Sequence, residues 1–420
     1  MPRKTPANPN PPDPVLKPLL RGTLALLALA TTAAHARSQD PIARDTLRPD
    51  TTSNRNTVRV CAGGDVTMGT NLDPSWAQSA SRKYGMRVDP FPDPDSLLAP
   101  LRPLVADADV VLLNVEGAIG EGVPARRKCA PGSTACFAFR MPPGTAPALR
   151  RVVDADSAAV VGNVANNHAG DAGRPGWRET ARRLEEAGVK VTGADSVPTL
   201  VATARGDTVA FLGFSVWIGP DARDLAAVRR IVGRAAERWP RVVVTVHMGA
   251  EGRAAQRTPD ARETFYGENR GNPVAFARAA ADAGADLVVG HGPHVMRAAE
   301  WRGQTLVLYS LGNLLTYGPF NLGEPLNRGA VACAVLDSTG RVVEAQLRST
   351  RQVPPGLLRA DPAARAAALT DSLSRLDFPA TGARVDPDGA IRVPGAPPAA
   401  GGAGETARRP RPVRKGGGED

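Results

Sequence analysis

Histidine is scarce in this chain, with five among 420 residues. His35 lies in the N-terminal leader, and the other four stand in short Gly- or Asn-rich motifs, each directly after an apolar run. Histidines scattered over a surface would not be grouped in this way. The motifs are Asn166–His168, Val246–Gly249 and Gly290–His294. These three motifs are therefore the first candidates for a functional site.

Aromatic residues make up only 4% of the chain, and no basic stripe is interleaved with them. Proteins that bind single-stranded nucleic acid combine aromatic stacking platforms with a basic groove, so we expect no nucleic-acid partner. The net charge is +10, carried almost wholly by arginine and partly by the terminal segments. A charge of this kind gives a weak preference for anionic polymers or membrane surfaces.

Cysteine is also rare, with four residues and no Cys-x-x-Cys motif, which argues against a thiolate zinc site. Cys129 and Cys136 flank a Pro/Gly/Ser loop that a disulfide would close, as is common in exported proteins. Cys61 and Cys333 lie in apolar, strand-like runs. There we expect buried free thiols.

No long apolar run is present near the N-terminus. The stretch 22–34 is about a dozen residues long, whereas a membrane-spanning helix needs roughly 20. It follows a basic leader and ends in Ala34-His35-Ala36, a small-x-small cleavage site. We expect export with cleavage after Ala36, and the alternative is an uncleaved N-terminal anchor. In both cases the body is expected outside the cytoplasm, as a periplasmic, cell-surface or secreted protein.

Strands that carry motifs recur from Asp65 to Asn313 without a linker between them, which favours one large α/β domain. Apolar strands such as Arg241–Val246 and Ala285–Val289, with a predicted helix Asn272–Ala283 between them, are typical of a sheet covered by helices on both faces. The Pro-, Gly- and Arg-rich tail cannot bury apolar surface and is expected to be disordered. The expected segments are a signal peptide or anchor 1–36, a linker 37–56, the domain 57–350, an extension with a short helix 351–393 and the tail 394–420.

Two acidic residues also follow predicted strands: Asp65 after Gly64, and Glu116 in Asn114–Glu116. Sites form at the carboxyl edge of an α/β sheet, and imidazole, carboxylate and carboxamide groups bind divalent ions. Two ions bridged by a carboxylate, with Glu116 as the natural bridge, would use all the candidates. We therefore expect one or two divalent ions, Mn, Fe, Zn or Mg. The candidate ligands are Asp65, Glu116, Asn167, His247, His291 and His294.

The remaining polar residues of these motifs are candidates for chemistry or support. His168 points away from its neighbouring ligand if the segment is extended, and suits a proton donor to a leaving oxygen. Asp171 is a candidate partner for the His168 ring, with helix capping as the alternative. Glu251 is a candidate base or imidazole partner, against a solvated loop carboxylate. Candidates for hydrogen bonds to the site are Asn166, Ser310 and Asn313, although the last two also suit a tight turn. The polar segment 260–272 is expected to form a loop over the site.

The order of these motifs resembles the successive signatures of the CapA-type poly-γ-glutamate capsule-biosynthesis family, over about residues 58–337. That family is similar to calcineurin-like metallophosphoesterases. The resemblance therefore implies a four-layer α/β/β/α sandwich, a single domain with metal ligands on loops at strand ends. The matching motifs are Gly64–Gly69, Asn114–Gly117, Ala165–His168 with Asp171 and Gly173, His247–Glu251, Gly290–Val295 and Ser310–Asn313.

The chain departs from the superfamily pattern at three places. Asp65-Val66-Thr67 lacks the histidine of the usual Asp-x-His, Glu116 replaces the bridging aspartate, and the closing Gly-His-x-His has become a His-x-x-His. A site for a single ion is therefore an alternative to a site for two. Met248 stands where the capsule family usually has an aromatic residue, which predicts a shallower substrate wall.

Two functions stay open at this point. One is a metal-dependent hydrolase that attacks a phosphoryl or acyl centre of an anionic polymer or phosphoester. The other is a non-catalytic assembly or export factor that binds polymer and keeps a structural or vestigial metal site. Both imply a role in the biosynthesis, processing or export of an anionic surface polymer such as poly-γ-glutamate. Membrane-bound capsule synthase or export subunits are the expected partners.

Overall fold

The computed structural model describes residues 56–69, 75–121 and 137–395. The expected signal peptide or anchor, the expected Cys129–Cys136 disulfide and the tail beyond residue 395 lie outside these ranges. Among the helices of the described ranges, none has the length and apolar character that crossing a membrane requires.

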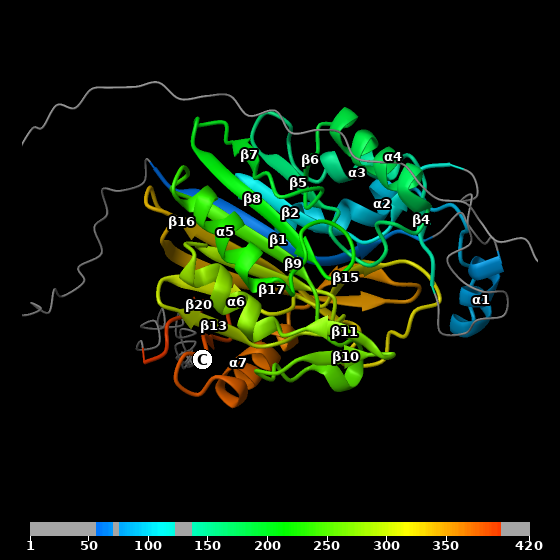
Figure 1. The fold of residues 1–420 in the computed structure, drawn as a ribbon. Helices are drawn as coiled ribbons and strands as arrows, with labels where there is room; N and C mark the ends of the chain where they lie inside the picture. Colours follow the sequence, from blue (N-terminus) through cyan, green and yellow to red (C-terminus); the bar gives the residue numbers. More distant parts are fainter. Residues whose placement is uncertain (1–55, 70–74, 122–136, 396–420) are drawn as a thin grey trace, which may run out of the picture. The chain divides into compact units, whose positions relative to one another are not determined.

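A first sheet has the strand order β18-β17-β16-β1-β2-β5-β6, with β15 beside β1 (Figure 1). Strands β1, β2, β5 and β6 run parallel, and β16, β17 and β18 continue the sheet in antiparallel fashion. The strands are β1 (Val58–Thr67), β2 (Val110–Val115), β5 (Ala159–Asn163), β6 (Lys190–Thr192), β15 (Asn313–Thr316), β16 (Arg328–Leu336), β17 (Val342–Val353) and β18 (Leu357–Ala360).

A second sheet has the order β13-β14-β12-β9-β8-β7, in which the four central strands are parallel. Its strands are β7 (Thr199–Ala202), β8 (Thr208–Ser215), β9 (Val242–His247), β12 (Leu287–His291), β13 (Ala299–Arg302) and β14 (Thr305–Leu308). Three small hairpins or ribbons lie outside the sheets: β3 (Ala118–Ile119) with β4 (Arg140–Met141), β10 (Glu263–Phe265) with β11 (Glu268–Gly271), and β19 (Arg384–Val385) with β20 (Ile391–Arg392).

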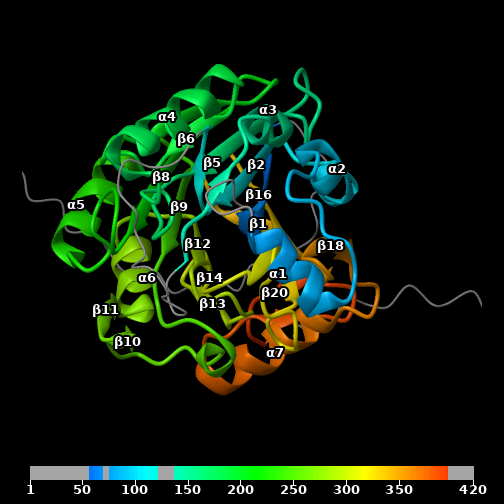
Figure 2. The ribbon, with the colours of Figure 1, turned by 90° about the vertical axis from the view of Figure 1, so that its right-hand side faces the viewer.

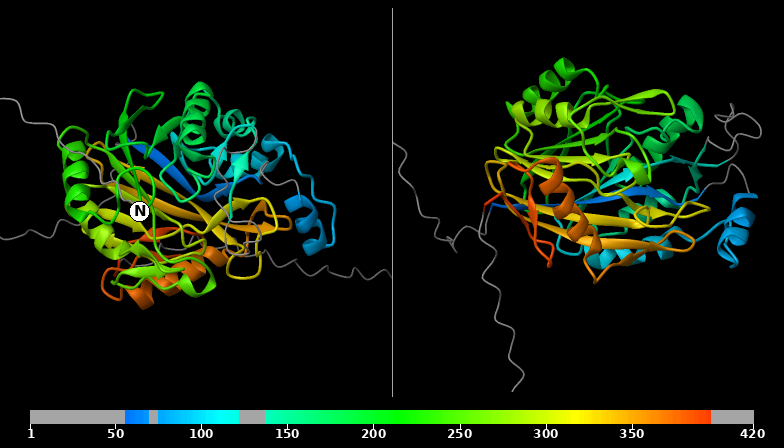
Figure 3. Two further views of the ribbon diagram at one scale, coloured as in Figure 1. Left: turned by 45° about the vertical axis from the view of Figure 1, so that its right-hand side comes forward. Right: turned by 90° about the horizontal axis from the view of Figure 1, so that it is seen from below.

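Most of the helices lie on the outer faces of the two sheets (Figure 2). The helices are α1 (Ser75–Tyr84), α2 (Pro94–Leu98), α3 (Thr145–Arg150), α4 (Gly173–Glu186), α5 (Leu225–Ala236), α6 (Pro273–Asp282) and α7 (Arg365–Asp377), with 3-10 turns at Ala99–Leu104 and Arg253–Ala255. Helices α1 to α4 belong to the first sheet and α5 and α6 to the second. Helix α7, orange in Figure 3, contacts β13, β16 and β17.

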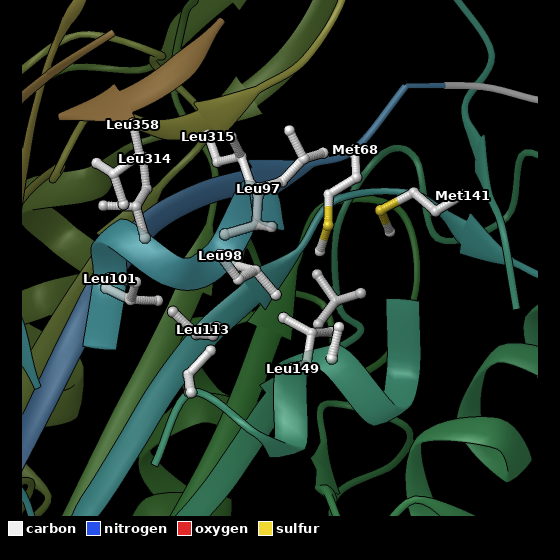
Figure 4. Packing of buried hydrophobic residues seen from close by; sticks show 14 of the residues in the cluster. Met68, Leu97, Leu98, Leu101, Leu113, Met141, Leu149, Leu314, Leu315 and Leu358 are labelled. Atoms are coloured by element: carbon white, nitrogen blue, oxygen red, sulfur yellow. The ribbon is translucent and has the colours of Figure 1, made fainter. Parts of the chain in front are cut away.

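Alternation along the strands divides the core into three layers of apolar side chains. On β1, Val60 and Ala62 face the second sheet, whereas Cys61 faces the helices of the first. The side chains on this side form the outer cluster of the first sheet, between the sheet and its helices. Figure 4 shows part of this cluster, including Leu98 and Leu149, between the sheet and helices α2 and α3. A third cluster lies between the second sheet and helices α5 and α6. The expected four-layer α/β/β/α sandwich is thus confirmed.

Cys61 and Cys333 form a disulfide, so the expectation of two buried free thiols was wrong. The two residues face each other directly in the antiparallel pair of β1 and β16. They are 272 positions apart in the sequence. Nothing local to either residue indicates this pairing, since it depends on how two distant strands are joined in register.

Removal of this disulfide is expected to destabilise the protein by about 2–5 kcal/mol, the usual cost of losing a native disulfide that closes a long loop. The test is urea unfolding of wild type and of the double variant Cys61→Ala/Cys333→Ala under oxidising conditions. Reductant added to the double variant then reports separately on Cys129 and Cys136. Equal unfolding midpoints for wild type and double variant would contradict the disulfide.

Two other expectations differ from the structure. The boundary after residue 350 falls inside β17, and residues 351–393 extend the first sheet through β18 and add α7. The segment 260–272, expected as a loop, contains the β10–β11 hairpin instead. A short antiparallel pair with few apolar residues has almost no local signature, because its stability comes from the contacts of the hairpin with the rest of the fold.

Candidate metal centre

The candidate ligands occupy the carboxyl ends of parallel strands in both sheets. His247 and His291 end β9 and β12 and stand opposite each other in register. Asp65 lies near the end of β1, and Glu116 directly follows β2. The two sheets meet here, because Asn114 at the end of β2 contacts both Asp65 of the same sheet and His247 of the other. One edge of the sandwich thus collects side chains from both sheets.

Two glycines allow neighbouring backbone segments to approach closely the strands that carry Asp65 and His291. A Cβ on Gly64, which precedes Asp65, would lie 2.1 Å from the carbonyl oxygen of Gly312. A Cβ on Gly290, before His291, would lie 2.2 Å from the carbonyl oxygen of Tyr309. No side chain larger than hydrogen fits at such a close approach. These two glycines therefore fix the backbone positions from which the side chains of Asp65 and His291 project.

His294 has a left-handed backbone conformation, with φ of 58°. A non-glycine residue adopts this conformation at a cost, and such residues cluster at functional sites. Here the turn brings the His294 ring back over the strand ends. Its Nδ1 lies 2.9 Å from Oδ2 of Asp65.

Asp65 lies at the centre of the contacts and is fully buried. Its Oδ1 accepts a hydrogen bond from Nδ2 of Asn114 at 2.7 Å and lies 3.3 Å from Nδ1 of His291. Its Oδ2 contacts His294 as described above. Asp65 therefore joins residues of both sheets through one carboxylate.

A second group of ligand atoms is spaced more widely. Oε1 of Glu116 lies 3.7 Å from Nε2 of His247 and 3.6 Å from Nε2 of His294. The same His294 nitrogen lies 3.8 Å from Oε2 of Glu251. These distances exceed hydrogen bonds, but they match two ligands of one ion, whose bonds of about 2.0–2.2 Å place ligand atoms some 3–4 Å apart. Ligand atoms of Asp65, Glu116 and His294 lie within 4.8 Å of one another.

Several buried polar atoms in this group lack a hydrogen-bond partner among the described residues: Oε1 of Glu116, Nε2 of His247 and Nε2 of His291. Burying such atoms without a partner is costly, so each calls for an explanation. One or two divalent ions would satisfy such atoms, and carboxylate oxygens and imidazole nitrogens are suitable donors for Mn, Fe and Zn. The residues present therefore fit a metal centre.

The electrostatics point in the same direction. Burial raises the pKa of Glu116 well above its usual value, and the carboxylates of Asp65 and Glu251 add to the shift. Burial alone would lower the pKa of His294, but Glu116, Asp65 and Glu251 together raise it to about 10. A proton on either Glu116 or His294 relieves the same excess of negative charge. A divalent cation would supply that positive charge and release protons.

The other two shifts concern Asp65 and His247. Burial would raise the pKa of Asp65, but its contacts with His291 and His294 hold that pKa well below its ordinary value. Burial lowers the pKa of His247 well below its ordinary value. Asp65 is therefore ionised and His247 neutral near pH 7, which are the forms that bind metals.

Three asparagines support the ligands from behind. Oδ1 of Asn114 accepts hydrogen bonds from Nδ2 of Asn163 at 3.0 Å and of Asn166 at 3.2 Å. Nδ2 of Asn114 lies 3.0 Å from Nδ1 of His247. A carboxamide nitrogen only donates, so Nδ1 of the neutral His247 ring accepts in this contact. A metal at Nε2 requires the proton at Nδ1 and therefore a different contact with Asn114. Asn114 and Asn163 were not among the candidate site residues, although both are carboxamides at the ends of neighbouring strands, the signal used for the other candidates.

The side chain of Asn166 also bonds the backbone around it. Its Nδ2 also donates to the carbonyl oxygen of Val115 at 2.9 Å, and its Oδ1 accepts from the backbone amides of His168 at 3.1 Å and Ala169 at 2.7 Å. This side chain thus shapes the loop that carries the half-buried Asn167 and the buried His168. The assignment of Asn167 as a ligand stays a prediction.

His168 and Asp171 are in direct contact. Nδ1 of His168 lies 2.6 Å from Oδ2 of Asp171, which also accepts a hydrogen bond from the backbone amide of Phe139 at 2.7 Å. The Phe139 ring packs on the imidazole, with 4.3 Å between the ring centroids. A buried carboxylate on one imidazole nitrogen fixes the orientation of the ring. This is the support that a general acid requires.

Ser310 and Asn313 contact the backbone next to the candidate ligands. Oγ of Ser310 accepts from the backbone amide of Gly312 at 3.2 Å, as the turn interpretation expects. Asn313 pairs with Asp65 in the parallel ladder of β1 and β15. Its Nδ2 donates to the carbonyl oxygen of His294 at 3.5 Å. These residues therefore support the backbone around Asp65 and His294.

Comparison with known proteins agrees with the order of the motifs. A family model described as "Bacterial capsule synthesis protein PGA_cap" matches residues 59–317. The "Capsule biosynthesis protein CapA" of Bacillus anthracis is 30% identical over 174 residues, which are 36% of this chain and 39% of that protein. The "PGA biosynthesis protein CapA" of Bacillus subtilis (strain 168) is 30% identical over 173 residues, 36% of this chain and 41% of that protein. The matched part thus spans about two fifths of each relative's length.

Solved structures show weaker likenesses. The Plasmodium protein described as "GAP50 the anchor in the inner membrane complex" has a TM-score of 0.38 and 9% identity, over 73% of this chain and 90% of that one. A 5'-nucleotidase precursor from Thermus thermophilus has a TM-score of 0.35 and 12% identity, over 77% and 59%. The NAD nucleotidase NadN of Haemophilus influenzae has a TM-score of 0.32 and 10% identity, over 76% and 55%. TM-scores below 0.5 carry no inference about function.

Proposed function

Because the chain belongs to the bacterial capsule synthesis protein family, we propose that it acts in the biosynthesis, processing or export of an anionic surface polymer such as poly-γ-glutamate. In this role it is a metal-dependent hydrolase that acts on the polymer or on a phosphoester. The observation that carries this proposal is the group of buried, partnerless ligand atoms of Glu116, His247 and His291 around Asp65 and His294. A polymer-binding scaffold without a metal site would need no such atoms.

The residues that would hold one or two divalent ions are Asp65, Glu116, Asn167, His247, His291 and His294. When bound, such ions supply Lewis-acid activation of a phosphoryl or acyl oxygen and of water. Asn114 orients Asp65 through its Nδ2, and Asp65 in turn orients His291 and His294. The ligand set is therefore organised before an ion binds, which lowers the cost of binding.

His168 would donate the proton that the leaving group needs when the bond breaks, to the oxygen of a phosphoester or to the amide nitrogen of a γ-glutamyl polymer. Asp171 and Phe139 hold the imidazole from two sides. Asn166 bonds both Asn114, which supports the ligands, and the backbone amide of His168, which places His168 beside the centre. General acid catalysis of this kind contributes typically about 10²- to 10⁴-fold in rate.

Export from the cytoplasm is part of the same proposal. The basic leader and the short apolar stretch ending in Ala34-His35-Ala36 support it. The Cys61–Cys333 disulfide also supports it, because disulfides persist mainly in oxidising compartments. Membrane-bound synthase or export subunits are the partners that such a location would supply.

Metal analysis of the purified mature protein is the first test of the proposal. We expect one or two equivalents of a divalent ion per chain, and a loss of thermal stability of about 5 °C or more when a chelator removes them, since ligands that bind only the native state stabilise it. Hydrolysis of phosphoesters and γ-glutamyl polymers is then screened with the metal-loaded protein. Protein that retains no ion and shows no change in unfolding with Mn²⁺ or Zn²⁺ would contradict the metal centre. Metal-loaded protein that binds polymer but hydrolyses nothing would favour the non-catalytic assembly factor.

A further inference from the structure

Arg270 is a buried arginine beside the candidate metal centre, in β11, and no sequence motif indicates it. Its side chain bonds two carboxylates: Nη1 donates to Oε1 of Glu251, and Nε donates to Oε2 of Glu268 at 3.1 Å. The side chain of Glu268 is 57% exposed and that of Glu251 only 16%. Glu251 also faces the candidate metal centre, because its Oε2 lies 3.8 Å from Nε2 of His294. Arg270 therefore holds one carboxylate that faces the centre and one that faces solvent.

Two aromatic rings hold the guanidinium of Arg270. Its central carbon lies 4.5 Å from the ring centroid of Trp217 and 5.1 Å from that of Phe265. Trp217 follows β8 and Phe265 ends β10, so the rings come from different parts of the chain. The Trp217 ring also packs edge-on against His247, with 5.6 Å between centroids. A planar guanidinium packed against aromatic rings keeps its donors in a fixed direction, which a lysine ammonium cannot do.

The backbone around Glu251 is attached on both sides. The amide of Gly249 donates to the carbonyl oxygen of Arg270 at 3.0 Å. The amide of Gly252 donates to the carbonyl oxygen of Pro293 at 2.9 Å. The short segment 249–252 therefore connects the β10–β11 hairpin to the turn that carries His294.

A buried ion pair between Arg297 and Glu263 attaches the start of the β10–β11 hairpin to segment 249–252. Arg297 is only 1% exposed and donates from Nη1 and Nη2 to the two carboxylate oxygens of Glu263, at 2.8 and 2.7 Å. Oε2 of Glu263 also accepts from the amide of Ala250 at 2.7 Å. The backbone is thus held independently of the Arg270 side chain, which leaves that side chain the task of orienting the Glu251 carboxylate.

We propose that Arg270 is a positioning residue that sets the metal affinity of the centre by holding the Glu251 side chain directed at His294. The inference rests on the proposed metal centre. Without the guanidinium, the Glu251 side chain is free to turn toward solvent, and the centre loses one of the three carboxylates that surround His294. Outer groups of this kind typically change metal affinity about 10- to 100-fold.

Calorimetric titration of the metal-free protein with Mn²⁺ tests this proposal. Arg270→Ala and Glu251→Gln are each expected to weaken Mn²⁺ binding about 10- to 100-fold. The double variant should bind no more weakly than either single variant, because both changes remove the same interaction. Arg270→Lys should give an intermediate affinity, since the charge is kept and the planar fork is lost. Glu268→Gln is the matched control, with unchanged affinity, because Glu268 bonds the same arginine but faces solvent.

Unfolding in the presence of a chelator checks that each variant is folded. If Arg270→Ala does not fold, Arg270→Lys combined with Glu251→Gln serves for the same cycle. Wild-type affinity in the Arg270 variants, or losses that add in the double variant, would overturn the positioning role while leaving the metal centre intact. Absence of Mn²⁺ binding by the wild type would instead overturn the proposed centre itself.

Discussion

His168→Ala is expected to lower the hydrolytic rate about 10²- to 10⁴-fold while the metal content per chain stays unchanged. The reason is that Nδ1 of His168 contacts Asp171, whereas the ligand atoms within 4.8 Å of one another come from Asp65, Glu116 and His294. The measurement is the rate with the best substrate of the hydrolysis screen, together with elemental analysis of the same sample. Asp171→Asn should also lower the rate at unchanged metal content, because it removes the charge that supports the ring and keeps the size of the side chain.

Two outcomes for His168→Ala would change the assignment. Loss of metal would mean that His168, and not Asn167, is the ligand of the Asn166–His168 motif. Full capsule-type function of the variant in cells, with unchanged polymer production, would retire catalysis and favour the scaffold.

His291→Ala is expected to abolish stoichiometric metal binding, with a loss of affinity larger than the 10- to 100-fold that is typical of outer groups. His291 is 1% exposed, its Nε2 has no partner among the described residues, and its Nδ1 lies 3.3 Å from Asp65. The variant also removes a buried side chain beside a buried carboxylate, so some loss of stability is expected without metal as well.

The measurements for His291→Ala are metal content, Mn²⁺ titration and thermal unfolding with and without chelator. Wild-type protein should lose stability on chelation, whereas the variant should not respond. His168→Ala is the matched control, since it removes a buried histidine of the same size outside the ligand set. Unchanged Mn²⁺ affinity in His291→Ala would remove His291 from the centre.

Continuous apolar runs made the parallel strands recognisable from the sequence. The predicted strand Arg241–Val246 corresponds to β9, and the predicted helix Asn272–Ala283 to α6, which Asn272 caps by accepting from the amide of Ala275 at 3.0 Å. In both elements the signal is local, since periodicity and capping involve residues within one or two turns. Because parallel strands end at a common edge, the residues that follow them could be placed near one another.

Other features depend on contacts between distant positions. Helix α1 was not expected, and its buried residues pack into the outer cluster of the first sheet. The Cys61–Cys333 disulfide requires β1 and β16 to pair in one particular register. Arg270 is one of many arginines in the chain, and only the fold brings Trp217, Phe265 and Glu251 around it.

The sequence by itself determined which chemical groups stand at the strand ends, because glycine, apolar runs and histidine motifs act locally. It did not determine which atoms meet. Asp65 and His294 are 229 positions apart, and their contact depends on the left-handed turn at His294 and on the glycines beneath the site. Tertiary structure decided these contacts. Hydrogen bonds and ion pairs are sensitive to differences in distance of a few tenths of an ångström, and only the packing of both sheets sets the distances to that accuracy.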